Sequence, residues 1–170
     1  MKHSRHFVLA FLVLAGRAVA AEPAPLPDST PWDVKQLSAT PEMQWLNREG
    51  NVHSLKYRGK TYKGHATSVF AWYASPTTLG AKPSAKKVPG IVLVHGGGGT
   101  AFSEWAEIWA KRGYAAIAMD LAGRGAGRKR LEDGGPDQTA ADKFGAIDGP
   151  LTDQWTYHAV ANVILAHSLL

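Results

Sequence analysis

A strand-like run that passes directly into a glycine-rich loop constrains this chain more than any other feature. Residues Gly90 to Val94 are apolar and largely β-branched, with no polar alternation. Such a run predicts a strand buried on both faces, as in a parallel sheet. His95 ends the run, and the four glycines Gly96 to Gly99 follow it. Because glycine adopts positive φ and lets backbone N–H groups approach a ligand closely, this loop is a candidate binding site.

The residues after the loop predict a strand–helix–strand unit. Ser103 is a candidate N-cap for a helix that ends near Arg112, and Gly113 suits the position after it. The run from Tyr114 to Asp120 then predicts a second buried strand. Apolar residues at helical spacing are expected to pack on the sheet: Phe102, Trp105, Ile108 and Trp109.

The flanking segments complete the expected α/β architecture. Residues 52–57 and 67–74 are rich in β formers and predict an antiparallel hairpin at the edge of a larger sheet. Residues 121–150 form a long loop at the end of a parallel strand, where ligand sites are common. Residues 152–170 predict a helix with one apolar line through Trp155, Ala159, Val163, Ala166 and Leu170, widened by Val160 and Ile164.

The N-terminal residues 1–20 have the pattern of a secretory signal. A basic start precedes a nine-residue apolar core, and Ala18-Val19-Ala20 is a small-x-small site that predicts cleavage after Ala20. We therefore expect a secreted or periplasmic protein. Residues 21–50 are expected to be an exported, proline-rich linker with a short helix over Pro41 to Asn47.

Charge and cysteine content exclude several classes of function. The chain has a formal net charge of +5, and removal of residues 1–20 leaves 16 basic and 14 acidic residues. So small an excess gives no argument for nucleic acid or for a membrane surface. Cysteine is absent, which excludes disulfides and thiolate zinc sites.

The glycine motifs do not fit the common phosphate-binding loops. A P-loop requires a lysine after its glycines, and none lies between Gly96 and Phe102. Gly123, Gly125 and Gly127 follow a G-x-G-x-G spacing, but a basic stretch replaces the apolar helix of a dinucleotide site. No close His/Glu pairing indicates zinc.

A strand that ends in His95-Gly96-Gly97-Gly98 and enters a helix matches an oxyanion loop. In acyl transfer, backbone N–H groups stabilise the developing carbonyl oxyanion, and loss of one donor costs about 3–4 kcal/mol in a studied case. The alternative is a glycine turn that only connects a strand to a helix.

The surrounding residues resemble the α/β-hydrolase superfamily, most closely the secreted esterases grouped with acetyl xylan esterases and dienelactone-hydrolase-like proteins. The resemblance covers roughly residues 50–170. It rests on Pro89 to Phe102, Trp105, Trp109, Arg112 to Asp120, Gly123 to Gly125, Val69 to Ala71, and Trp155 with Tyr157 to Val160. It implies that residues 51–170 are the N-terminal part of an α/β-hydrolase domain: an edge hairpin, then a βαβ unit of a mostly parallel sheet.

The resemblance implies a serine hydrolase of carboxylic esters, possibly acetylated carbohydrate, without cofactor or metal. His95, Gly96, Gly97, Gly98 and Gly99 would form the oxyanion loop, with an N–H of Gly97 and its neighbours as donors. The family's serine lies in a G-x-S-x-G elbow, which this sequence does not contain. We therefore expect the serine, acid and base downstream of Leu170, a truncated domain, and no activity from these 170 residues alone.

The remaining serines and histidines do not replace the missing triad. Ser103 lies beside the wrong strand, and Ser168 lies within a helix between His167 and Leu169. His158 is expected to pack or hydrogen-bond within its own helix, so neither it nor His95 should act as the triad base.

Two alternatives remain at this point. Leu169 and Leu170 lie within an apolar helix without a stop signal, which favours part of a larger domain over a compact protein with an abrupt helical end. The chain could also be a non-catalytic exported binding module, for example for polysaccharide, that uses Trp72, Tyr73 and the 121–150 loop.

Overall fold

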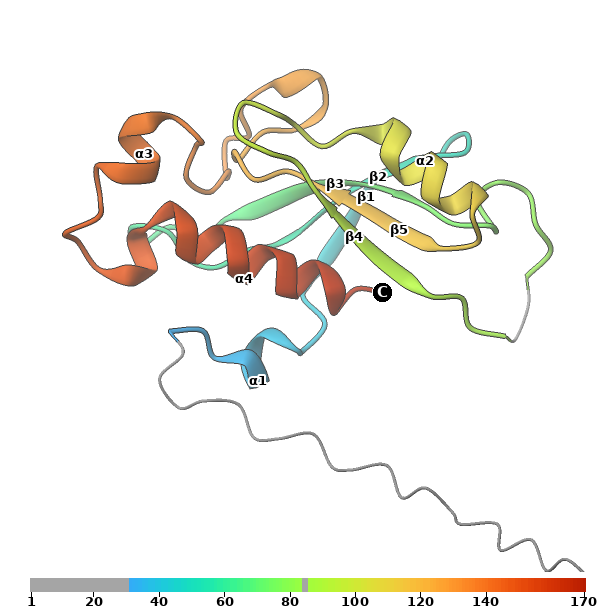
Figure 1. Cartoon of the computed structure of the whole chain (residues 1–170), viewed down its shortest axis with the longest axis horizontal. Helices are drawn as coiled ribbons and strands as arrows, with labels where there is room; N and C mark the ends of the chain where they lie inside the picture. Colours follow the sequence, from blue (N-terminus) through green and yellow to red (C-terminus); the bar gives the residue numbers. More distant parts are fainter. Residues whose placement is uncertain (1–30, 84–85) are drawn as a thin grey trace, which may run out of the picture.

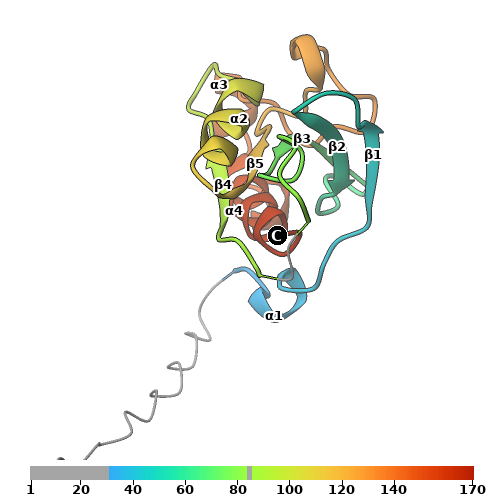
Figure 2. The ribbon, with the colours of Figure 1, turned by 90° about the vertical axis from the view of Figure 1, so that its right-hand side faces the viewer.

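The computed structural model describes residues 31–83 and 86–170, so the expected signal segment lies outside the described residues. A single mixed sheet carries helices on both of its faces (Figures 1 and 2). In chain order the elements are α1 (Val34–Leu37), β1 (Met43–Asn47), β2 (His53–Arg58), β3 (Ser68–Ala74), β4 (Gly90–Val94), α2 (Ser103–Lys111), β5 (Ala115–Met119), the 3-10 turn η1 (Ala126–Arg128), α3 (Ala140–Phe144), the 3-10 turn η2 (Leu151–Asp153) and α4 (Trp155–His167).

The sheet has five strands in the order β1-β2-β3-β5-β4. β4 and β5 are parallel, in register from Gly90 opposite Ala115 to Val94 opposite Met119, as the βαβ pattern predicts. The other three pairings are antiparallel. The expectation of a mostly parallel sheet is therefore wrong for the described residues, because β1, β2 and β3 all join the sheet as antiparallel neighbours.

The predicted hairpin is present as β2 and β3, but it does not lie at the edge. β1 pairs with the outer side of β2, with Trp45 opposite Leu55. The short helix expected over Pro41 to Asn47 is therefore wrong. Its apolar residues Met43 and Trp45 are spaced two apart, which places both on one face of a strand.

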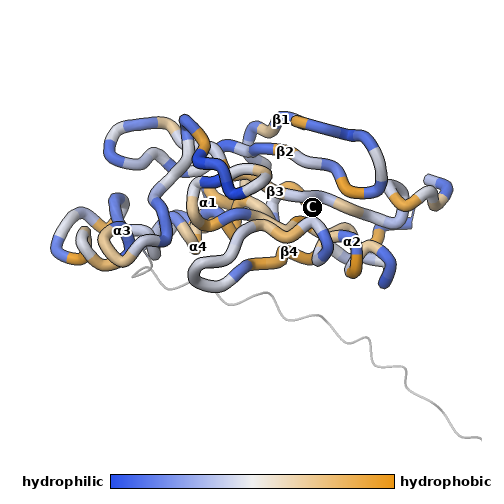
Figure 3. Tube along the Cα trace, turned by 90° about the horizontal axis from the view of Figure 1, so that it is seen from above, coloured by the Kyte–Doolittle hydropathy of each residue, from blue (hydrophilic) through white to orange (hydrophobic). Residues whose placement is uncertain are grey.

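β4 is an edge strand and is not buried on both faces as its sequence predicts. Gly90 and Val94 are exposed, Val94 by 43%, and the three residues between them are half-buried. Figure 3 shows the hydrophobic colouring of this strand beside the more polar loops. The reason is topological: β5 lies between β3 and β4, so the described chain pairs β4 on one side only.

α2 packs on one face of the sheet through its small residues. Ala106 and Ala110 are fully buried against Ala74, Ala116 and Ala118, with Trp109 at the border of this cluster. The expected aromatic stripe is wrong in part, since Trp105 is 39% and Ile108 45% exposed. The fully buried strand residues beneath α2 are alanines, and small helix residues allow a close approach to them.

α4 packs on the opposite face and closes the larger core. Ala161, Leu165 and Ala166 are buried there among Leu55, Tyr57, Val69, Ala71, Ile117 and Met119. The predicted apolar line is confirmed in part: Ala166 is buried, and Trp155, Ala159 and Val163 pack against this core. Val160 is 39% exposed, whereas the polar His158 and Asn162 are buried. The buried face of α4 thus carries polar groups that need partners.

Candidate functional site

The candidate site lies where the two parallel strands end. β4 leads into the glycine loop at His95, and β5 leads into Asp120 and the loop beyond it. Because β4 and β5 are parallel neighbours, both loops leave the same edge of the sheet. This is the edge at which ligand sites form in open α/β sheets.

His95 is buried and joins the two loops. Its Nε2 accepts a hydrogen bond of 3.0 Å from the Leu121 N–H, and its Nδ1 lies 2.8 Å from the Gly96 carbonyl oxygen. An acceptor at Nε2 and a carbonyl at Nδ1 assign the proton to Nδ1, so the ring is the neutral tautomer that donates to Gly96. Both ring nitrogens are therefore occupied by backbone contacts, and His95 serves to hold the loop.

Asp120 is buried beside His95 and organises the second loop. Its Oδ2 accepts hydrogen bonds from the N–H groups of Ala122, at 2.8 Å, and of Arg124, at 2.7 Å. Its Oδ1 lies 3.5 Å from His95 Nε2 and has no hydrogen-bond partner in the described structure. Burial, and secondarily the charge of Asp120, raises the pKa of Tyr57 well above its usual value. The sequence analysis gave Asp120 no role of its own. A carboxylate at the end of a buried strand, shortly before a glycine-rich loop, could have indicated that it holds this loop.

The glycines of the loop differ in whether their position could accept a side chain. A Cβ at Gly99 would lie 2.8 Å from His95 Nδ1 and 3.0 Å from the Gly96 carbonyl oxygen. Gly98 has φ of +73°, which a side chain rarely adopts. At Gly96 a Cβ would meet no atom within 4 Å. The loop therefore requires glycine at positions 98 and 99, and tolerates a small side chain at position 96.

The loop leaves backbone donors free for a ligand. The Gly99 N–H closes the turn on the Gly96 carbonyl at 3.1 Å. Within the described chain, no hydrogen bond uses the N–H of Gly97 or of Gly98. These two groups are consequently the candidate oxyanion donors, and the predicted loop residues His95 to Gly99 lie together at one site.

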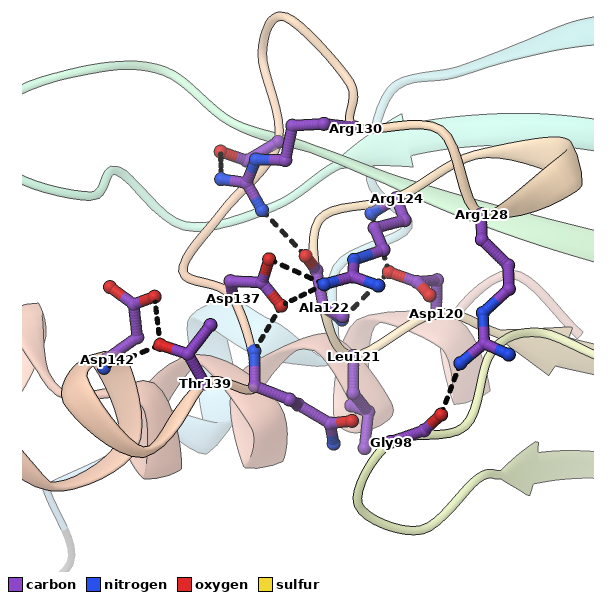
Figure 4. A network of polar contacts seen from close by, with 12 residues as sticks. Gly98, Asp120, Leu121, Ala122, Arg124, Arg128, Arg130, Asp137, Thr139 and Asp142 are labelled. Atoms are coloured by element: carbon purple, nitrogen blue, oxygen red, sulfur yellow. Dashed lines mark hydrogen bonds and ion pairs between the residues drawn. The ribbon is translucent and has the colours of Figure 1, made fainter.

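The 121–150 loop brings cationic side chains to the glycine loop (Figure 4). The Arg128 guanidinium donates a hydrogen bond to the Gly98 carbonyl. Lys143 Nζ lies 3.8 Å from the position that a Cβ of Gly97 would occupy. The site is therefore bordered by positive charge, although it contains Asp120 within its base.

An ion pair between Arg124 and Asp137 forms one wall of a small cavity beside the loop. Arg124 Nη2 donates hydrogen bonds to both carboxylate oxygens of Asp137, at 3.0 Å to Oδ1 and 2.8 Å to Oδ2. Burial opposes ionisation of Asp137, but the hydrogen bonds from Arg124 and from the Gln138 N–H outweigh it and hold its pKa below the usual value. The cavity has a volume of about 140 Å³ and is lined by Gly98, Gly99, Ala122, Arg124, Asp137, Gln138 and Thr139.

The other candidate residues lie away from this chemistry. His158 is buried, and its Nε2 donates to the Thr152 carbonyl at 2.8 Å, outside its own helix. Ser103 is the first residue of α2, whose N-cap is Phe102 and not Ser103 as predicted. Ser168 Oγ lies 2.9 Å from the Leu37 carbonyl oxygen. None of the three is placed to act as a nucleophile or base at the glycine loop.

Trp72 and Tyr73, which the binding-module alternative uses, lie on opposite faces of the sheet. Trp72 packs with Phe70 on the face beneath α2, at 5.1 Å between ring centroids. Tyr73 packs with Trp45 on the face beneath α4, at 5.7 Å. Successive strand residues point to opposite faces, so the two rings are separated by the sheet.

The described residues include no cluster of three or more histidine, aspartate or glutamate side chains suited to a metal ion. In the same part of the chain, no helix combines the length and apolar character needed to span a membrane. Comparison with models of protein families, with curated proteins and with solved structures finds no match to this chain.

Proposed function

We propose that this chain supplies the oxyanion-binding part of a serine hydrolase that acts on carboxylic esters. The observation that carries the proposal is the pair of free N–H groups at Gly97 and Gly98, in a loop held by His95. A tetrahedral intermediate needs such preorganised donors where its negative charge develops. Arg128 and Lys143 add positive charge at the border of the loop.

The arrangement of strands supports an α/β-hydrolase reading of the fold. An antiparallel hairpin is followed by a βαβ unit, and the glycine loop lies at the carboxyl end of its first strand. α4 returns to the opposite end of the sheet, where the Leu170 side chain lies against Gly90 at the start of β4. A strand entering there would run parallel to β4 along its free edge, and this is where the proposal places the nucleophile strand.

In this proposal the described chain binds the oxyanion, and a further segment supplies the catalytic triad. Serine attack on the ester carbonyl would generate the oxyanion against the Gly97 and Gly98 N–H groups. The serine, acid and base would come from a segment that this sequence does not include, since it contains no G-x-S-x-G. The pattern of residues 1–20 supports a secreted or periplasmic enzyme acting on small or carbohydrate esters.

The test is covalent labelling with a fluorophosphonate probe, which modifies activated serines. We expect no labelling of the 170-residue chain, and labelling once the chain is extended by a downstream coding segment that contains G-x-S-x-G. Labelling of the 170 residues alone would contradict the placement of the nucleophile. A stop codon directly after Leu170 would instead favour the non-catalytic binding module.

A further inference from the structure

A large open groove lies on the α4 side of the sheet, at the end opposite the glycine loop. It has a volume of about 740 Å³ and continues the buried face beyond the last turn of α4. Its floor is apolar, with Leu55 and Ile117 buried beneath it, and Leu169 and Leu170 form one wall. Nothing in the proposed reaction uses this groove.

Three aromatic rings give the groove its shape. Trp45 meets His53 edge-on, with 5.7 Å between ring centroids and an interplanar angle of 87°. It meets Tyr73 in the same way, at 5.7 Å and 68°. All three rings are half-buried, so each keeps part of its surface open to an occupant. Grooves lined by such rings are the usual docking sites for proline-rich segments in extended conformation.

The charge of the groove favours an acidic occupant. The Arg48 guanidinium lies 5.3 Å above the centre of the Trp45 ring, and His53 lies on the same wall. Among the described residues, no aspartate or glutamate lines the groove. An occupant with apolar and negatively charged residues would therefore be complementary to it.

Residues 21–30 of the same chain have this composition. Pro23, Pro25 and Pro27 alternate with small or apolar residues, and Glu22 and Asp28 flank them without any basic residue. Alternating prolines favour the polyproline II conformation, which loses little entropy on docking. Both the shape and the charge of the groove match this segment.

The segment also has the reach to enter the groove. Trp32 is held at the start of α4, where its Nε1 donates to the Tyr157 carbonyl at 3.0 Å and its ring stacks on Tyr157. The 13 residues of α4 span about 20 Å from there to the groove. Ten residues in polyproline II conformation extend about 31 Å. Figure 1 shows the described chain beginning near the first turn of α4, at the end away from the C-terminus.

We propose that residues 21–25 dock in the groove formed by Trp45, His53 and Tyr73, with Arg48 neutralising Glu22, while residues 26–30 cover the distance from Trp32. The proposal is independent of the hydrolase function. It assigns the exported N-terminal segment a structural partner on the same chain and leaves the glycine loop open at the other end of the sheet.

Pulsed electron–electron spin distance measurement on the full chain tests this directly, because the chain contains no cysteine that would compete for the label. One label is placed at Ala24→Cys and the other at Asn51→Cys, an exposed position next to the groove. We expect one narrow distance distribution. Trp45→Ala should broaden it, and the matched change Trp105→Ala, at an exposed tryptophan of α2, should leave it narrow.

A second pair of labels, at Asn51→Cys and Phe144→Cys, reports whether each variant keeps the described fold. A broad distribution for the first pair, unchanged by Trp45→Ala while the second pair stays narrow, would overturn the proposal. A narrow distance that appears between two singly labelled chains after mixing would overturn it in favour of a second copy as the occupant.

Discussion

The Leu121 N–H donates a 3.0 Å hydrogen bond to His95 Nε2 and so connects the ends of two parallel strands through a buried side chain. The other ring nitrogen binds the Gly96 carbonyl. A single imidazole therefore fixes the positions of both loops at the candidate site.

His95→Ala removes the acceptor for a buried backbone donor and leaves a cavity. An unsatisfied buried N–H costs about 1–3 kcal/mol, and the lost packing adds to it. We expect a loss of about 2–4 kcal/mol in the free energy of unfolding, measured by urea titration. His53→Ala, at a half-buried ring on the groove, serves as the control and should cost clearly less. Equal losses in the two variants would argue against the special role of His95.

Asp120→Asn tests the carboxylate that holds the second loop. The charged Oδ2 accepts two backbone N–H groups, and charge-assisted bonds of this kind contribute about 1.5–3 kcal/mol. We expect faster amide hydrogen exchange at Ala122 and Arg124, with lower stability. The exposed Asp148→Asn provides the matched change of charge and should leave both amides protected as before.

Two glycines of the same loop should respond differently to one methyl group. Gly99→Ala places its Cβ against His95 Nδ1 and the Gly96 carbonyl, and overpacking of this kind costs about 1–3 kcal/mol. Gly96→Ala meets nothing within 4 Å and should change stability by less than about 0.5 kcal/mol. Thermal unfolding of the pair measures the difference; a larger loss from Gly96→Ala would disprove the loop geometry.

Substitutions at Gly97 test whether its N–H stabilises the oxyanion. They are made in a chain extended by the downstream G-x-S-x-G segment that reacts with the fluorophosphonate probe. Gly97→Pro removes the N–H that the proposal assigns to the oxyanion, and loss of one such donor lowers kcat about 10²–10³-fold. Gly97→Ala keeps the N–H and brings its Cβ no closer than 3.8 Å to Lys143 Nζ, so it should retain most of the activity. Ester hydrolysis by both variants, at matched folded content, is the measurement. Similar activity in the two would exclude Gly97 as a donor.

The buried His158 should make the free energy of unfolding depend on pH. Burial lowers its pKa below the ordinary value, although the Thr152 carbonyl opposes the shift. The unfolded chain, with a histidine pKa near 6.5, therefore takes up this proton before the folded chain does. The stability contributed by neutral His158 is fully present above about pH 6.5 and is lost as the pH falls through the window between the two pKa values.

His158→Gln should flatten the loss of stability below about pH 6.5, measured as the urea midpoint across pH 5 to 8. The exposed His167→Gln is the matched control and should retain the slope of the original chain. An unchanged slope in His158→Gln would show that other groups set the acid limit.

Local patterns in the sequence were sufficient for much of the fold. The β-forming runs predicted β2, β3, β4 and β5, and the Gly113 signal predicted the end of α2, where that glycine has φ of +93°. The strand–loop–helix order also predicted that His95 to Gly99 form one loop. These features depend on backbone preferences and on periodicity, which act over a few residues.

Burial was less predictable, because periodicity does not specify what a face packs against. The helical spacing of the aromatic residues predicted that they form the buried face of α2. Instead, Ala106 and Ala110 are the residues buried against the strand alanines. Met43 and Trp45 fit a short helix by composition, yet pairing with β2 made this segment a strand. In both cases a neighbouring element outweighed local preference.

Local residue patterns were enough to locate the main turns and the residues of the glycine loop, and the sequence contains no G-x-S-x-G. The position of β5 between β3 and β4, and the meeting of His95 with Asp120 at the base of the site, became known only from the folded chain. Their ring and carboxylate are 25 residues apart in sequence, and the parallel pairing of β4 with β5 brings them within 3.5 Å. Such contacts depend on strand order, which arises from long-range packing that no local pattern encodes.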